Sequence, residues 1–194
     1  MHAYSFRLMP SLSPALRKAL LNLPQKEKDQ LLVRLVCQDK VLTEQLQFRL
    51  LEGEEALEER RTRLRERLDD PVRGYHQTPN DLLLILRQLQ NQISYHAKIT
   101  GDHYGEVELT VRLLNNVFRQ QPAAVARLTG TTQPLLSHLA RRADTTLRLA
   151  DKLEADYHLE LADAVNELLT NLWSTAAAPL ARDLGLPRQW GVYQ

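Results

Sequence analysis

Leucine recurs at intervals of three and four residues along most of this chain, and prolines divide the leucine-rich runs into short segments. That spacing places apolar side chains on one face of an α-helix, whereas a half-buried strand would require alternation. Leucine supplies 39 of the 194 residues, against seven glycines and three phenylalanines. This composition favours helix over strand. The sequence therefore predicts an all-α fold of eight or nine helices, arranged as an irregular helical bundle or as stacked helical hairpins resembling a short α-solenoid.

Two helix starts are marked by capping residues. Ser13 precedes Pro14, and Thr78 precedes Pro79. A serine or threonine accepts hydrogen bonds from the first free backbone N–H groups, and proline fits the first helical turn. The second of these helices carries an apolar stripe that steps by four, three, four and three residues: Leu82, Leu86, Leu89, Ile93 and His96.

The remaining segments suggest one domain with a short tail. Residues 1–12 show no periodicity, so we expect a tail there and a single all-α domain over 13–194. Asp70-Pro71 should end a strongly charged helix, because proline lacks the N–H that would continue it. A candidate internal break therefore lies at 71–78.

Charge and cysteine usage narrow the function classes. Lys plus Arg is 25 and Asp plus Glu is 24, giving a net charge of +1. A dedicated nucleic-acid binder usually carries a clear basic excess, so a nucleic-acid partner is not expected. Cys37, the single cysteine, lies in an apolar run that predicts burial. We find no segment of about 20 apolar residues and no secretory leader pattern, so we expect a cytoplasmic protein without a membrane partner.

Several segments resemble a known group of proteins. They are Leu21-Asn22-Leu23-Pro24, the following helix over 27–37, Leu46-Gln47-Phe48, Leu57–Arg61 and Tyr95–Thr100. Together they resemble an uncharacterised family of small all-α cytoplasmic bacterial proteins. That family has no assigned activity, so the resemblance implies a helical bacterial protein and supplies no catalytic residue.

The segment over residues 95–108 is the richest in chemically versatile side chains. Its candidate binding patch comprises Tyr95, His96, Asp102, His103, Tyr104 and Glu106. One interpretation brings His96, His103 and Glu106 onto a zinc, iron or manganese ion. The other makes His96 a partly buried structural residue at a helix junction, with Asp102 or His103 as its hydrogen-bond partner. Two glycines interrupt the spacing and the Glu-x-x-His pairs of di-iron bundles are missing, so we favour the structural interpretation.

Two carboxylate pairs form a second candidate site. Glu55 with Glu58, and Glu160 with Asp163, each place two acids on one helical face. All-α nucleotide pyrophosphohydrolases hold magnesium with similar pairs, although on helices that follow one another closely. Here about a hundred residues separate the pairs, and the first pair lies in a charged run.

That charged run also contains an arginine stripe, formed by Arg60, Arg61, Arg63, Arg65 and Arg67. Five glutamates share the same helix and would repel phosphate, which favours an exposed, salt-bridged helix over a nucleic-acid surface. A narrow seam of Leu57, Leu64 and Leu68 should face the protein, with Arg61 between its members.

The sequence thus favours a non-enzymatic helical binding or scaffold protein, with no catalytic residue and no cofactor assigned. Its expected partner is another protein or a second copy of itself. The first alternative is a magnesium-dependent nucleotide pyrophosphohydrolase using Glu55, Glu58, Glu160 and Asp163. The second alternative is a nucleic-acid-associated protein.

Overall fold

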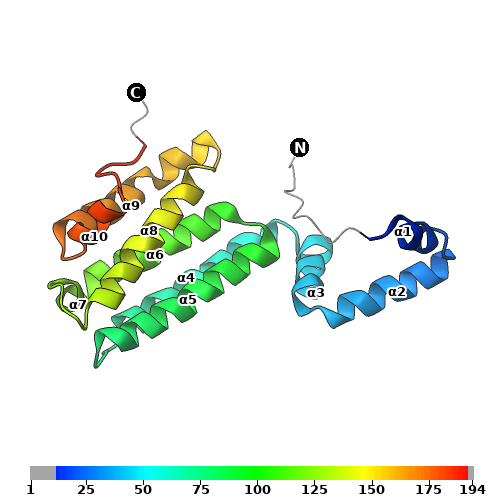
Figure 1. Cartoon of the computed structure of the whole chain (residues 1–194), viewed down its shortest axis with the longest axis horizontal. Coiled ribbons are helices and arrows are strands. Elements are labelled where there is room, and N and C mark those ends of the chain that lie inside the picture. Colours follow the sequence, from blue (N-terminus) through cyan, green and yellow to red (C-terminus); the bar gives the residue numbers. More distant parts are fainter. Residues whose placement is uncertain (1–11, 192–194) are drawn as a thin grey trace. The chain divides into compact units, whose positions relative to one another are not determined.

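The structure, a computed structural model, describes residues 12–191, and within that range every regular element is helical (Figure 1). The prediction of an all-α fold is confirmed, and the ten α-helices described slightly exceed the expected eight or nine. The α-helices are α1 (Pro14–Leu21), α2 (Gln25–Gln38), α3 (Lys40–Gln47), α4 (Glu55–Arg73), α5 (Pro79–Thr100), α6 (His103–Gln120), α7 (Pro122–Val125), α8 (Gln133–Ala150), α9 (Ala155–Ser174) and α10 (Ala178–Asp183), with a π-helical turn, η1 (Phe48–Glu52), between α3 and α4.

Both capping residues act as expected. The Ser13 hydroxyl accepts a hydrogen bond from the backbone N–H of Leu16 at the start of α1. At the start of α5, Thr78 and Asp81 form a reciprocal capping box, in which each side chain accepts from the other residue's backbone N–H. These contacts span three residues, which is why the sequence alone specifies them.

The chain divides into two compact units, the first ending at Leu46 and the second beginning at Gln47. The candidate break at 71–78 does not mark this division. Instead, α4 continues through Pro71 to Arg73, and the chain then turns directly into α5. The tail expected over residues 1–12 lies outside the described residues except for Leu12, which is exposed.

Helix α4 continues past its internal proline because contacts with other parts of the bundle stabilise its last turn. Val72 is fully buried in the bundle. The side chain of Gln121 donates to the backbone carbonyls of Val72 and Gly74, at 2.7 and 3.1 Å. Pro71 removes one intrahelical bond, the one its missing N–H would have donated to the carbonyl of Arg67, and the helix ends two residues later. The expected stop is therefore displaced to Gly74.

The second unit is a helical bundle built around α6. This helix packs against α4, α5, α8 and α9, and more than half of its residues are buried. In a solenoid each hairpin contacts only its neighbours, so the shared central helix identifies a bundle. The leucine stripe of α5 faces this core, and its last member, His96, is also buried.

Buried polar side chains fix the register of α6 against two neighbours. Gln90 on α5 donates to Thr110 on α6 at 3.1 Å. Asn115 on α6 donates to the backbone carbonyl of Ala164 on α9 at 2.9 Å and accepts from Asn171 at 3.2 Å. Each group has a partner, so its burial does not carry the cost of an unsatisfied polar atom.

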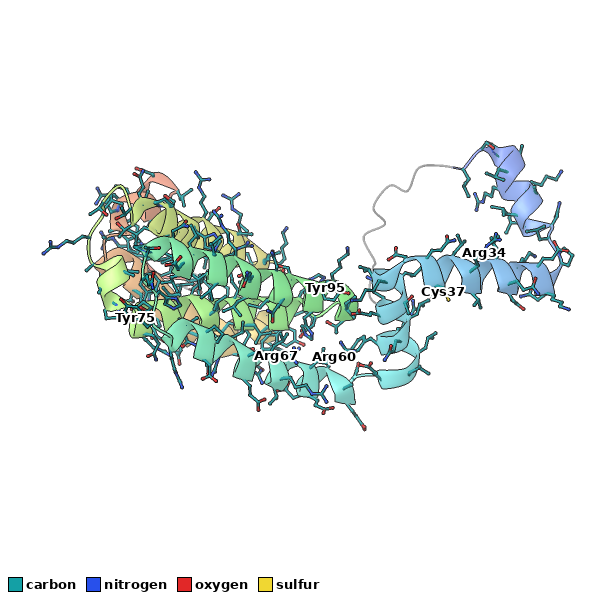
Figure 2. All side chains as sticks on the ribbon, turned by 90° about the horizontal axis from the view of Figure 1, so that it is seen from below. Arg34, Cys37, Arg60, Arg67, Tyr75 and Tyr95 are labelled. Atoms are coloured by element: carbon teal, nitrogen blue, oxygen red, sulfur yellow. The ribbon has the colours of Figure 1, made fainter. Side chains whose placement is uncertain are left out.

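The described part of the N-terminal unit, residues 12–46, has no buried core. Helices α1, α2 and α3, all fully described, contain no buried residue. The prediction that Cys37 is buried is wrong for this reason, since its thiol is exposed on α2 (Figure 2). Over residues 12–191, no helix combines the length and apolar character needed to cross a bilayer.

Candidate functional site

A tight turn between α5 and α6 positions most of the predicted binding patch. Gly101 ends α5 in the left-handed conformation, with a φ of 76°, which glycine adopts without the steric cost of a Cβ. Asp102 then caps α6, its Oδ1 accepting from the backbone N–H of Gly105 at 2.8 Å. Only these two linking residues separate the helices, so the last turn of α5 adjoins the first turn of α6.

Asp102 is the centre of a buried charge cluster. Arg61, on α4, donates through Nε to Oδ2 and through Nη2 to Oδ1, both at 2.6 Å. His96 Nε2 lies 3.3 Å from Oδ2. Burial by itself would raise the pKa of Asp102, but hydrogen bonds from His96, Arg61 and the Gly105 N–H outweigh it and hold the pKa below its usual range. The carboxylate is therefore a fixed negative charge that joins three helices.

Tyr104 extends this cluster toward α9. The Arg61 guanidinium lies over its ring, 5.0 Å from the centroid, and the Tyr157 ring centroid is 4.7 Å away. Burial, together with the carboxylate of Glu160, raises the pKa of Tyr104 to about 12. The phenol therefore stays protonated at neutral pH, which suits a packing and hydrogen-bonding role.

Arg61 is the member of the cluster that was not assigned to the patch from sequence. The only indication was its position in the apolar seam, four residues after Leu57 and three before Leu64. A cation on a buried face requires a partner, because burying an unpaired charge is costly. The partner is Asp102, 41 residues later in the chain.

The other patch residues do not join this cluster. His103 is exposed, and Tyr95 is exposed on α5. Glu106 accepts a hydrogen bond from Ser94 at 3.2 Å. His96, His103 and Glu106 are therefore not brought together as a ligand set. Among the described residues, no group of three or more His, Cys, Asp or Glu side chains could hold a metal ion.

The two carboxylate pairs do not meet as a magnesium site. Glu58 accepts from Arg61 and Arg65, at 3.4 and 2.7 Å, so its oxygens are held by cations of its own helix. Glu160, on α9, lies near the Tyr104 hydroxyl. Glu55 and Asp163 are exposed on their helices. This geometry does not support the pyrophosphohydrolase alternative.

The prediction of a salt-bridged α4 is confirmed. Arg63 pairs with Glu59 one turn away, as the spacing indicates. Arg65 reaches across to α6, where its Nε lies 3.2 Å from Oε1 of Glu108. The leucines Leu64 and Leu68 of α4 are buried. The stripe therefore stabilises the packing of α4 on α6 as well as facing solvent.

An open groove of about 690 Å³ lies between α4 and α5. It is lined by Arg60, Arg63, Leu64, Arg67, Asn91, Gln92, Tyr95, His96 and Ile99. Figure 2 shows three of these residues from the two helices, Arg60, Arg67 and Tyr95. Two of the arginines already bind carboxylates, since Arg60 pairs with Glu52 at 2.7 Å and Arg63 pairs with Glu59. Part of the positive charge along the groove is therefore already compensated.

Comparison with known proteins leaves the function to be argued from the structure itself. No protein-family model matches the chain, and no curated protein or solved structure is detectably similar to it. The resemblance to small all-α bacterial proteins therefore stays a prediction from the sequence.

Replacing His96 tests its structural assignment. His96→Leu should fold and lose at most about 1.5 kcal/mol of unfolding free energy, because its contact with Asp102 is long and Arg61 still binds the carboxylate. His96→Asp should cost more, on the order of 1–3 kcal/mol, because it adds a second buried carboxylate beside Asp102. Urea unfolding followed by tryptophan fluorescence measures both. If His96→Leu lost as much as His96→Asp, the ring would be essential to the cluster and our assignment would be wrong.

Proposed function

We propose that this protein is a non-enzymatic helical binding protein that attaches to another polypeptide through α1 and α2. The observation that carries the proposal is the lack of any buried residue in α1, α2 and α3. Of the fifteen large apolar side chains exposed in the described chain, six fall within residues 12–46: Leu12, Leu16, Leu21, Leu32, Val33 and Leu35.

Exposed helices of this length need cover to be stable. The longest of the three, α2, has 14 residues, and isolated helices shorter than about 12–15 residues are marginal in water. Fully burying one leucine or valine side chain contributes roughly 1.5–3 kcal/mol. Covering the apolar side chains of α1 and α2 would therefore both stabilise the helices and drive association.

The apolar surface of α2 is too wide for a single neighbouring helix. Leu31, Leu32 and Val33 are consecutive, and Leu35 and Val36 fill the same arc. At about 100° per residue, these positions span roughly 200° of the helix circumference, against the apolar stripe of about 100° typical of a helix on a core. A polypeptide surface that contacts α2 from two sides fits this arc.

A second copy of the chain is the first partner to test. The net charge is only +1, so two copies repel each other weakly. The described part of the N-terminal unit also carries both signs of charge, with Lys26 and Lys28 beside Glu27 and Asp29 on α2. Weak repulsion and an uncovered apolar surface both favour association between copies.

Hydrogen exchange of the full chain tests the proposal. At a concentration chosen so that light scattering gives the mass of a monomer, the amides of α2 should exchange rapidly while those of α6 are protected, because exposed helices open locally. Protection of α2 that appears with dimerisation at higher concentration would identify the second copy as partner. Rapid exchange in a monomer at every concentration would point to a different protein. Strong protection of α2 in the monomer would overturn the proposal, since the cover would then come from the same chain.

A matched pair of variants locates the surface. Leu32→Asp should weaken association at least about tenfold, because it removes roughly 1.5–3 kcal/mol of apolar burial. Leu159→Asp makes the same chemical change at an exposed leucine on α9 and should leave association unchanged. Equal effects of the two variants would argue against α2 as the attachment site.

A further inference from the structure

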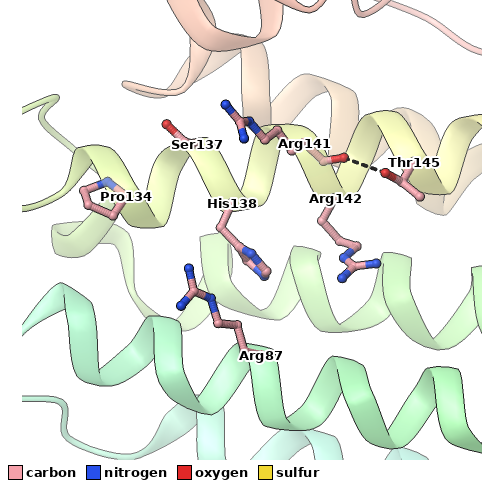
Figure 3. A pocket seen from close by; sticks show the side chains of 7 residues that line it. All are labelled: Arg87, Pro134, Ser137, His138, Arg141, Arg142 and Thr145. Carbon is pink, nitrogen blue, oxygen red and sulfur yellow. Dashed lines mark hydrogen bonds between the residues drawn. The ribbon is translucent and has the colours of Figure 1, made fainter.

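A second, unrelated feature lies between α5 and α8, where a pocket of about 340 Å³ opens to solvent. We call it the α5–α8 pocket. Its lining residues are Arg87, Pro134, Ser137, His138, Arg141, Arg142 and Thr145. Figure 3 shows Arg87 extending from α5 toward α8, with His138 and Arg142 extending from α8 toward α5. Three arginines and a histidine thus line one small space that no carboxylate lines.

These cations have no ion-pair partner among the described residues. Within residues 12–191, Arg87, Arg141 and Arg142 form no ion pair and their guanidinium groups make no hydrogen bond. Some other arginines of the bundle pair between helices, as Arg61 does with Asp102 and Arg112 does with Asp69. Like charges near one another repel, so an anion bound among them would interact favourably with all of them.

Arg87 and Arg141 are exposed in this open pocket, whereas His138 and Arg142 are half-buried. Burial lowers the pKa of Arg142, and Glu106 on α6 opposes that effect only in part. Burial, together with the positive charges of Arg142 and Arg87, lowers the pKa of His138 to about 4. The imidazole is therefore neutral at pH 7, leaving one ring nitrogen as a donor and the other as an acceptor.

We propose that the α5–α8 pocket binds the phosphate groups of a small phosphorylated molecule, a phosphomonoester or a diphosphate. Guanidinium groups match phosphate oxygens with two parallel hydrogen bonds each, and Arg87 and Arg142 come from the two facing helices, with the His138 ring between them in the view of Figure 3. Ser137 adds a hydroxyl donor to the same lining. The two negative charges of a phosphate would neutralise the two positive charges of Arg87 and Arg142. A single carboxylate would neutralise only one of them.

The dimensions favour a small ligand over a polymer. A space of about 340 Å³ is at the lower end of the range for small-molecule sites. A nucleic acid would instead need an extended basic track along its backbone, and the chain's net charge is only +1. This site is separate from α1 and α2, so its test is independent of the proposed attachment to a polypeptide.

Titration calorimetry with pyrophosphate as the probe tests the proposal, using the full chain at 150 mM salt. We expect saturable binding of one pyrophosphate per chain. Arg87→Gln and Arg142→Gln should each weaken it at least about tenfold, because charge-assisted hydrogen bonds are among the stronger ones. Arg148→Gln is the matched control, since Arg148 lies on the same helix, pairs with Asp144 and does not line the pocket. It should bind as the wild type does.

The stability of the unliganded protein distinguishes an arginine that binds a ligand from one that only stabilises the fold. Arg142→Met keeps most of the side-chain volume and removes one of the repelling charges. Its unliganded unfolding midpoint should equal or exceed that of the wild type while pyrophosphate binding is lost. A clear fall in that midpoint would show that Arg142 serves the fold, and would contradict a binding role.

Three further results would overturn the proposal. The first is no heat of binding at millimolar pyrophosphate. The second is an equal loss of binding in the Arg148→Gln control, which would indicate nonspecific attraction. The third is tighter binding of a single-stranded oligonucleotide, or of phosphatidylglycerol vesicles, than of pyrophosphate, which would assign the arginines to a polymer or a lipid surface instead.

Discussion

Replacing Asp102 with alanine should destabilise the helical bundle by about 3–5 kcal/mol, the cost expected when one partner of a buried ion pair is removed. The substitution leaves the guanidinium of Arg61 without its carboxylate on a face that is nearly buried. It also removes the side-chain cap from the backbone N–H of Gly105 at the start of α6. Urea unfolding followed by tryptophan fluorescence measures the loss, because Trp173 and Trp190 both lie in the second unit.

The pH dependence of this effect identifies its cause. The pKa of Asp102 is lowered in the folded protein, so the ion pair adds stability above the ordinary carboxyl value of 3.8, and that stability is lost as pH falls through the lower native value. The gap between wild type and Asp102→Ala should stay constant from pH 8 to about 5 and should narrow below 3.8. A gap independent of pH down to pH 2 would attribute the loss to packing alone.

Asp102→Asn separates the cap from the charge. Asparagine is as good a capping residue as aspartate, so this variant keeps the acceptor for Gly105 while losing the charge that faces Arg61. It should be more stable than Asp102→Ala by about 1 kcal/mol, the usual value of such a cap. Equal stability of the two variants would mean that the cap contributes nothing here.

Gly105→Ala should also destabilise the bundle, by about 2–4 kcal/mol, although alanine is normally the better helix former. A Cβ at position 105 would lie 2.0 Å from Oδ2 of Asp102 and 2.9 Å from Nε of Arg61. One of these side chains must then move, which separates the ion pair. The same unfolding experiment measures the effect, with tryptophan fluorescence as the probe.

Combining the two substitutions tests whether they act through the same contact. Once Asp102 is alanine, a Cβ at position 105 no longer meets the carboxylate, so Gly105→Ala should cost little or even gain up to about 1 kcal/mol from helix propensity. A double-mutant cycle should therefore show strong coupling. Simple additivity of the two losses would mean that Gly105 matters for another reason.

The features of the fold that the sequence predicted well are those that depend on residues only three or four positions apart. The Thr78–Asp81 capping box and the leucine stripe of α5 depend on spacings of three and four, and both are present as expected. The burial of His96 follows from the same stripe. It is buried more deeply than expected because Asp102 satisfies one ring nitrogen from the adjoining turn.

Features that depend on distant partners were not accessible in this way. The seam containing Arg61 indicated a cation on a buried face, but nothing in the local pattern identified Asp102, 41 residues later, as its carboxylate. Pro71 predicted a helix end that Gln121 and the buried Val72 override. Periodicity predicts which face of a helix is apolar and suited to burial, but it does not predict which element packs against that face. For that reason α2 and α5 look alike in sequence, yet only α5 lies in a core.

The α5–α8 pocket has the same origin. Arg141 and Arg142 are adjacent in sequence. Arg87 lies on another helix, more than fifty residues earlier. Their convergence follows from the packing of α5 against α8. Local spacing along the chain does not predict that residues so far apart in sequence line the same pocket.

The central position of α6 also bears on how the chain is made. Two of the helices that surround it, α4 and α5, precede it in the chain, and the other two, α8 and α9, follow it. During synthesis, α6 therefore leaves the ribosome after two of its packing partners and before the other two, which lie within residues 133–174. Until α9 has emerged, the face of α6 that packs against α9 stays uncovered, so the bundle can close around α6 only after α9 has been synthesised.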